Sequence, residues 1–247
     1  MSKPRKPVAR RKRSAAARLR PFWILLVLLV AVGGLGGYYA ATWPGFRAHQ
    51  IIVIGNRRVG AKDILHRAAI NRRINIWLQN MGAVADRVAT IPDIGNVTIR
   101  RAFPASVSIV VRERHPYAVI LSGNKKIVVD RDLRVLDFRA APTLPQFVVP
   151  LGVLAPGKDV KDERVARLRD DYDQLEGAHV IVATMRYDRF GDLIAVTPRG
   201  VQILLGGDDE DLARKISLIG PILSQTAGKK IAAIDLRAPG TPVVRYK

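Results

Sequence analysis

The sequence lacks cysteine entirely and has only four histidines among its 247 residues. The lack of cysteine excludes disulfides, zinc–thiolate sites and thiol catalysis, so any folded part depends on its apolar core. The histidines lie in unrelated segments, and none has a metal-ligand spacing such as His-Glu-x-x-His. The sequence also has no Gly-x-Ser-x-Gly motif and no phosphate-binding glycine loop. We therefore expect no enzyme, no catalytic residues, no metal, no cofactor and no small-molecule substrate.

Acidic residues are absent from residues 1–20, and charged residues of either sign are absent from Pro21 to Thr42. A helix of 22 residues reaches about 33 Å, which matches a hydrocarbon core of about 30 Å. A cleavable signal peptide is the alternative, but its apolar region is shorter and ends at a small-x-small site. Here Tyr38 and Tyr39 lie beside the small residues. The pattern predicts an uncleaved transmembrane helix over 21–42.

Orientation follows from the nine Lys and Arg residues in the tail 1–20. Positive charge stays in the cytoplasm, so residues after the span are expected on the outer side of the plasma (inner) membrane. Within the span, Gly33 and Gly37 have the small-xxx-small spacing that lets helices pack closely. A flexible or merely tolerated glycine-rich stretch is the alternative, because glycine is common in membrane helices, and both interpretations stay open.

The net charge of +20 at pH 7 is unevenly spread. Nine of these charges belong to the tail, which has no interleaved aromatics for base stacking, so nucleic-acid binding is not expected. Residues 47–118 hold 12 Lys and Arg against 4 Asp and Glu. These charges either meet acidic partners or anionic lipid heads, or form a solvated surface. The residues concerned are Arg57, Arg58, Arg72, Arg73, Arg100 and Arg101.

The first region outside the membrane, 47–116, shows the order β-α-α-β-β. Strands are expected at 49–56, 95–102 and 106–114, and helices at 60–70 and 83–91. The last two strands form a hairpin, in which Val107, Ile109 and Val111 point to one face. We expect a small three-stranded sheet with two helices.

The second region, 117–247, predicts a mostly antiparallel β domain with two helices, so the fold class is α+β. Residues 142–157 are expected to be a loop because of their prolines. Helices are expected at 161–177 and 208–225. Strands are expected at 117–121, 126–130, 134–138, 180–188, 192–197, 201–205, 229–237 and 241–247.

Two acidic clusters offer the best candidates for a cation site. The run 208–211 is explained better by acids in the first turn of a helix, which the helix dipole favours. Asp170, Asp171 and Asp173 are expected to line a solvated helix face. Neither cluster therefore predicts a metal site.

The motifs 53–65 and 91–120 resemble the FtsQ/DivIB family of cell-division proteins. The matching sequences are "VIGNRRVGAKDIL" and "IPDIGNVTIRRAFPASVSIVVRERHPYAVI". Segments "VVDRDLRVLDF", "LPQFVVPLG", "GVQILLG" and "IAAIDLR" are similar to the second domain of that family. The resemblance implies a POTRA (polypeptide-transport-associated) domain at 47–116 and an FtsQ-type β domain at 117–247.

The resemblance also implies a role. Such a protein is a non-enzymatic scaffold of the divisome that binds FtsB/FtsL-type membrane proteins and helps recruit and regulate septal peptidoglycan synthesis. The expected location is the division septum. The surface around Val97, Arg100 and Arg101 is the hypothesised recruitment surface of the POTRA domain.

In this family the partner adds a strand to an open sheet edge near the C-terminus, where unpaired N–H and C=O groups are available. The hypothesised contact residues here are Arg237, Ala238, Gly240, Val243, Val244, Arg245 and Tyr246. Alternatively, the strand 243–246 merely completes the sheet. Ala238 stands where relatives often have an aromatic, and Pro239 and Pro242 remove two backbone donors.

Two other classes of function compete with the scaffold. A POTRA-containing component of an envelope protein-export or assembly machine needs a transmembrane barrel, and no series of lipid-facing strands is present. A wall enzyme or wall-binding protein needs a catalytic pair, and none can be named. The order of motifs therefore favours the division scaffold.

Overall fold

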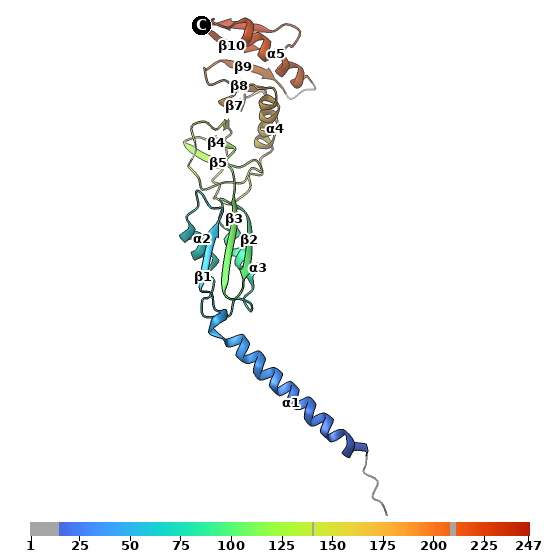
Figure 1. Cartoon of the computed structure of the whole chain (residues 1–247). Coiled ribbons are helices and arrows are strands. Elements are labelled where there is room, and N and C mark those ends of the chain that lie inside the picture. Colours follow the sequence, from blue (N-terminus) through green and yellow to red (C-terminus); the bar gives the residue numbers. More distant parts are fainter. Residues whose placement is uncertain (1–14, 140, 208–210) are drawn as a thin grey trace, which may run out of the picture. The chain divides into compact units, whose positions relative to one another are not determined.

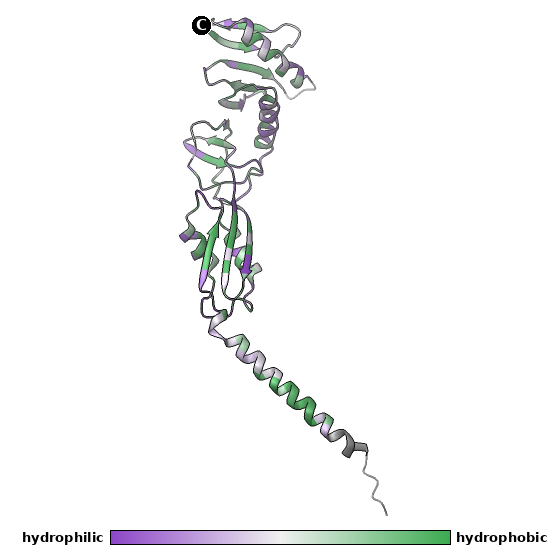
Figure 2. Ribbon diagram, viewed as in Figure 1, coloured by the Kyte–Doolittle hydropathy of each residue, from purple (hydrophilic) through white to green (hydrophobic). Residues whose placement is uncertain are grey.

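The computed structural model describes residues 15–139, 141–207 and 211–247. Its first element is the helix α1 (Ala15–Thr42). The part Pro21–Thr42 is long and apolar enough, by length and composition, to cross a membrane. Figure 2 shows that the middle of this helix is hydrophobic on every visible side. The tail residues 1–14 and the acidic residues 208–210 lie outside the described part of the chain.

The chain divides into two compact units. One comprises the chain up to Ile52 together with 70–81 and 100–108, and the other comprises 53–69, 82–99 and 109–247. The first unit contains the end of α1 and a 3₁₀ turn, Pro44–Phe46. Within it, the N–H of Ile76 donates to Phe46 O at 2.9 Å, and the ring of Phe46 contacts that of Phe103.

A three-stranded sheet has the order β1-β3-β2 (Figure 1). Its strands are β1 (Gln50–Ile54), β2 (Ile94–Ala102) and β3 (Ser106–Glu113), and its helices are α2 (Ala61–Ala68) and α3 (Met81–Ala89). The alternation of β3 is confirmed, because Val107, Ile109 and Val111 are buried while the residues between them are half-buried. The expected order β-α-α-β-β is therefore confirmed.

The turn after β1 requires glycine. Gly55 has a φ of +92°, and a Cβ there would lie 2.2 Å from the carbonyl oxygen of Val111. Asn56 closes the same turn, since its side chain donates to Val59 O at 3.0 Å. The Gly-Asn pair of the motif is thus explained by backbone geometry.

The rest of the second unit is built on an eight-stranded sheet of order β11-β10-β9-β8-β7-β6-β4-β5 (Figure 1). Four neighbouring pairs are antiparallel and three are parallel. The strands are β4 (Ala118–Ser122), β5 (Lys125–Val129), β6 (Gln146–Val148), β7 (Thr184–Tyr187), β8 (Leu193–Val196), β9 (Gln202–Gly206), β10 (Ile231–Asp235) and β11 (Val243–Tyr246).

Two helices, α4 (Glu163–Gly177) and α5 (Leu212–Gln225), pack against one face of this sheet. Leu168 and Leu175 of α4 and Ile219 of α5 are fully buried among strand residues such as Phe147 and Ile203. Each helix thus buries one apolar stripe, as its spacing predicts. The fold class α+β is confirmed.

Three of the elements expected in this unit differ in the structure. Residues 142–157 are not all loop, because Gln146–Val148 forms β6 between β4 and β7. Residues 134–138 form two isolated bridges rather than a strand. The strand expected at 180–188 is confined to Thr184–Tyr187.

The helix face expected to be solvated is partly buried. Asp171 is 6% exposed and accepts a hydrogen bond from the hydroxyl of Tyr187 at 2.7 Å. Asp173 accepts from the hydroxyl of Tyr117 at 2.6 Å and from Arg131 at 2.7 Å. These carboxylates are structural acceptors, because buried hydroxyl groups require partners.

Candidate functional site

The strand β11 is the last of its sheet, and no described strand lies beyond it. It pairs only with β10, in antiparallel register from Asp235↔Val243 to Ile231↔Tyr246. The side chains of Val243 and Tyr246 are exposed by 54% and 50%. Val244 is half-buried and packs against the core, which fixes the strand to the sheet. The outer backbone groups of β11 are therefore available to a further strand.

Both prolines near this edge lie outside the paired residues. Pro239 and Pro242 precede β11, whose ladder covers Val243–Tyr246. A turn between the two strands is closed by the N–H of Thr241 donating to Ala238 O at 3.1 Å. Ala238 and Gly240 are exposed in this turn. The prolines therefore remove no donor from the ladder of β11.

Arg237 is held against Asp235 at the end of β10. Its guanidinium Nη2 lies 2.7 Å from Oδ2 and its Nε 3.0 Å from Oδ1 of the carboxylate. The hydrogen bond from Arg237 holds the pKa of Asp235 below its ordinary value and outweighs the effect of burial. A Cβ on Gly206 would lie 3.3 Å from Cγ of Arg237. The arginine is thus pre-positioned, with an exposed fraction of 55% for its side chain.

The opposite edge of the sheet is closed. The outer side of β5 is covered in its second half, where the N–H of Leu136 donates to Val128 O at 2.9 Å and Val135 bridges Val129. The first half carries the exposed pair Lys125 and Lys126. Charged lysines on an edge oppose pairing with another strand. The sheet therefore has one open edge, and it is β11.

The three residues of the hypothesised recruitment surface all lie on β2 but differ in environment. Val97 is half-buried, and Arg100 is exposed. The guanidinium of Arg101 donates to Gln79 O at 2.9 Å and lies 5.7 Å from the ring centre of Trp77. Arg101 therefore has a structural role that the sequence did not indicate.

Glu113 also has a structural role that was not predicted. Its carboxylate accepts hydrogen bonds of 2.7 to 2.9 Å from the backbone N–H groups of Arg57, Arg58 and Val59. Burial by itself would raise the pKa of Glu113, but these three donors outweigh it and hold the pKa below its ordinary value. The carboxylate thus fixes the segment after β1. The only sign of this role in the sequence was the place of Glu113 in the motif 91–120.

Replacing Glu113 with Gln should lower the free energy of unfolding by about 1–2 kcal/mol at neutral pH, because the backbone donors lose a charged acceptor. The folded-state pKa is lowered, so this stabilisation exists above the ordinary pKa of 4.5 and is lost as the pH falls through the folded value. Denaturant unfolding at neutral and acidic pH measures the difference. Asp86→Asn, an exposed site on α3, is the control. A difference independent of pH would contradict this role.

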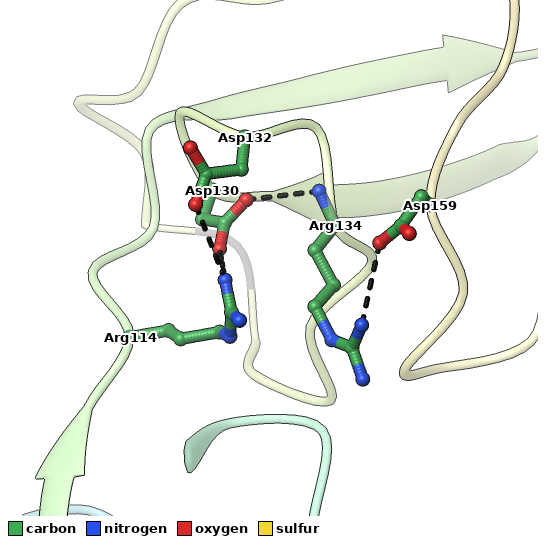
Figure 3. Close-up of polar contacts among 5 residues, drawn as sticks. All are labelled: Arg114, Asp130, Asp132, Arg134 and Asp159. Carbon is green, nitrogen blue, oxygen red and sulfur yellow. Dashed lines mark hydrogen bonds and ion pairs between the residues drawn. The ribbon is translucent and has the colours of Figure 1, made fainter. Parts of the chain in front are cut away.

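A polar network follows the end of β3 (Figure 3). The guanidinium of Arg114 contacts the carboxylate of Asp130, whose other oxygen accepts from the N–H of Arg134 at 2.9 Å. Arg134 in turn lies 3.3 Å from Asp159. The Asp130 side chain is only 8% exposed, whereas that of Asp132 is 85% exposed at 3.5 Å from Arg114. The network anchors the strand end to the loop after β5.

Within the described residues, no three His, Asp or Glu side chains gather where they could hold a metal ion. The described residues of the two acidic clusters add no such group. Asp211 precedes α5 and makes no capping hydrogen bond through its side chain. The expectation of no metal and no cofactor stays a prediction.

Comparison with known proteins agrees with the resemblance found in the sequence. The profile described as "POTRA domain, FtsQ-type" matches residues 46–114. The cell division protein FtsQ of Mycobacterium tuberculosis is 31% identical over 130 residues, which cover 51% of this chain and 41% of that protein. The FtsQ of Mycobacteroides abscessus is 25% identical over 227 residues, covering 90% of this chain and 68% of that protein.

The cell division protein DivIB of Clostridium acetobutylicum is 29% identical over 96 residues, or 39% of each chain. The chain thus covers about two fifths of the length of the first relatives. The extracytoplasmic domain of DivIB from Geobacillus stearothermophilus aligns at 15% identity and a TM-score of 0.27, covering 45% of this chain and 92% of that one. On its sequence matches, residues 46–114 of this chain match the FtsQ-type POTRA domain, and the chain is similar to cell division proteins of the FtsQ/DivIB family.

Proposed function

We propose that this protein is a non-enzymatic scaffold of the bacterial divisome that binds FtsB/FtsL-type membrane proteins and helps recruit and regulate septal peptidoglycan synthesis. The open edge β11 is the observation that carries this proposal. An unpaired antiparallel edge gives a partner strand main-chain hydrogen bonds, and exposed alternate side chains give it specificity. Val243, Arg245 and Tyr246 supply such side chains, and Arg237 stands beside the start of the strand.

The proposal includes an anchor in the plasma membrane. The apolar part of α1 spans the bilayer, with the basic residues 1–20 in the cytoplasm and the bulk of the chain outside. The domains are the POTRA domain at 47–116 and the β domain at 117–247. Val97, Arg100 and Arg101 on β2 form the proposed recruitment surface, and Arg100 is its exposed charge.

The change V243P/V244P tests the edge. The N–H groups of adjacent strand residues point to opposite sides, so the two prolines remove one donor that faces the partner and one that faces β10. Binding of the FtsB-type partner should therefore weaken by about tenfold or more. The measurement is co-purification of the full chain with that partner from membranes of the source organism. The matched control is K125P/K126P, the same change on the closed edge β5.

A side-chain change separates binding from folding. Val243→Asp keeps the backbone donors and changes an exposed side chain, so the fold should persist, as circular dichroism would show. Undiminished partner binding in both folded β11 variants would contradict the proposed edge. A fluorescent fusion adds the cellular readout, for which we expect midcell rings. A uniform envelope signal with normal division on depletion would favour an export or assembly role instead.

A further inference from the structure

A cleft of about 850 Å³ lies at the end of the eight-stranded sheet where β11 finishes. Its walls are the segment before β7 (178–181), the turn after β8 (197–199), the last turn of α5 and the start of β10. Arg237 lies at the other end of β10, so the cleft is separate from that contact residue, although Tyr246 lies beside its rim. No motif in the sequence indicated this cleft.

The cleft combines apolar walls with a basic rim. Ile181, which is 75% exposed, and the half-buried Leu223 both line the cleft and give it apolar surface. The basic residues of the lining are Arg199, Lys229, Lys230 and Lys247. Among the residues that the structure describes, no aspartate or glutamate lines the cleft. A ligand that fits this surface is negatively charged and also carries apolar groups.

Two turns with left-handed glycines and the end of α5 contribute to the walls. Gly200 (φ +78°) ends the turn that carries Arg199, and Gly228 (φ +87°) precedes the two lysines. The Thr226 hydroxyl donates to Ile222 O at 2.6 Å and closes the end of α5. A preformed cleft loses little entropy when a ligand binds.

The open edge runs into this cleft. The ammonium group of Lys229 lies 5.4 Å from the ring centre of Tyr246, the last residue of β11. The N–H of Lys247 donates to Lys230 O at 2.8 Å. A partner strand that pairs along β11 therefore ends beside the basic rim of the cleft.

We infer that the cleft binds an acidic segment with interspersed apolar side chains, belonging to the protein partner that pairs with β11. Acidic side chains of the bound segment complement the four basic side chains of the cleft. Its apolar side chains complement the exposed Ile181. A lipid headgroup or wall polymer would supply the charge but leave the apolar wall uncovered. The inference rests on the proposed function and names the chemistry of its partner.

The test uses the full chain in nanodiscs of zwitterionic lipid and a fluorescein-labelled synthetic peptide in which pairs of Glu alternate with pairs of Leu. Fluorescence anisotropy should show binding that weakens about tenfold or more in K229E/K230E, because each reversal replaces attraction with repulsion. The matched control is K125E/K126E, another exposed pair of adjacent lysines, which should bind as the wild type does. Ile181→Ser should also weaken binding.

Three outcomes would overturn the inference. They are equal binding by the two double variants, equal binding of a peptide with Ser in place of Leu, and no peptide binding by the wild type in zwitterionic nanodiscs. The proposed function fails separately, through partner co-purification with V243P/V244P. If that variant loses the partner while K229E/K230E keeps it, the scaffold stands and the cleft inference does not.

Discussion

Replacing Phe147 with Ala should lower the free energy of unfolding by about 3–5 kcal/mol, the largest effect we expect from a single change. Phe147 is fully buried on β6, between the parallel neighbours β4 and β7. Its ring contacts those of Tyr117 and Tyr172, so truncation leaves a cavity lined by rigid aromatic groups. Such walls relax little into the space.

Chemical denaturation with far-UV circular dichroism measures this loss. The control is Phe190→Ala, since Phe190 is 75% exposed in the turn after β7 and its loss should cost well under about 1 kcal/mol. A similar cost for both changes would mean that β6 is not a buried inner strand of the sheet.

Replacing Asp130 with Asn should cost about 2–3 kcal/mol of unfolding free energy. The change leaves the guanidinium of Arg114, whose side chain is 22% exposed, without its charged partner. It also weakens the acceptor for the N–H of Arg134 (Figure 3). The magnitude lies below that of a fully buried pair because Arg114 keeps some access to water.

A double-mutant cycle isolates the pair. In a chain that already carries Arg114→Gln, Asp130→Asn should cost clearly less than in the wild type. Asp132→Asn serves as the matched control, because its carboxylate is 85% exposed and the change should stay within about 0.5 kcal/mol. Additive costs of the two changes would show that the ion pair contributes nothing to stability.

The elements that were predicted correctly have apolar residues at a regular spacing along the sequence. β3 alternates strictly, and α4 repeats its apolar residues at helical spacing, so each pattern reports one buried face. β6 was missed because three residues are too few to show a period and prolines flank them. Its place depends on the parallel strands on both sides, which are distant in sequence.

The polar contacts could not be predicted for the same reason. Asp171 and Asp173 look like a solvated face of α4 until Tyr187 and Tyr117 are placed beside them. Glu113 belongs to the recognised motif, yet its three backbone donors lie more than fifty residues earlier. The resemblance placed an open edge at 243–246, and β11 is an edge strand, whereas partner pairing there stays a prediction. The cleft beside it is formed by segments that are distant in sequence and has no sequence signature.

The unequal edges of the eight-stranded sheet determine the stoichiometry of any strand-pairing complex. Lys125 and Lys126 and the covering residues 135–136 close the β5 side, so a chain bound along β11 has no second copy of the site to occupy. A sheet with two free edges can accept a strand at each of them, whereas the eight-stranded sheet offers β11 alone for direct pairing. Strand pairing with this sheet is thus expected to place one partner strand against each copy of the chain.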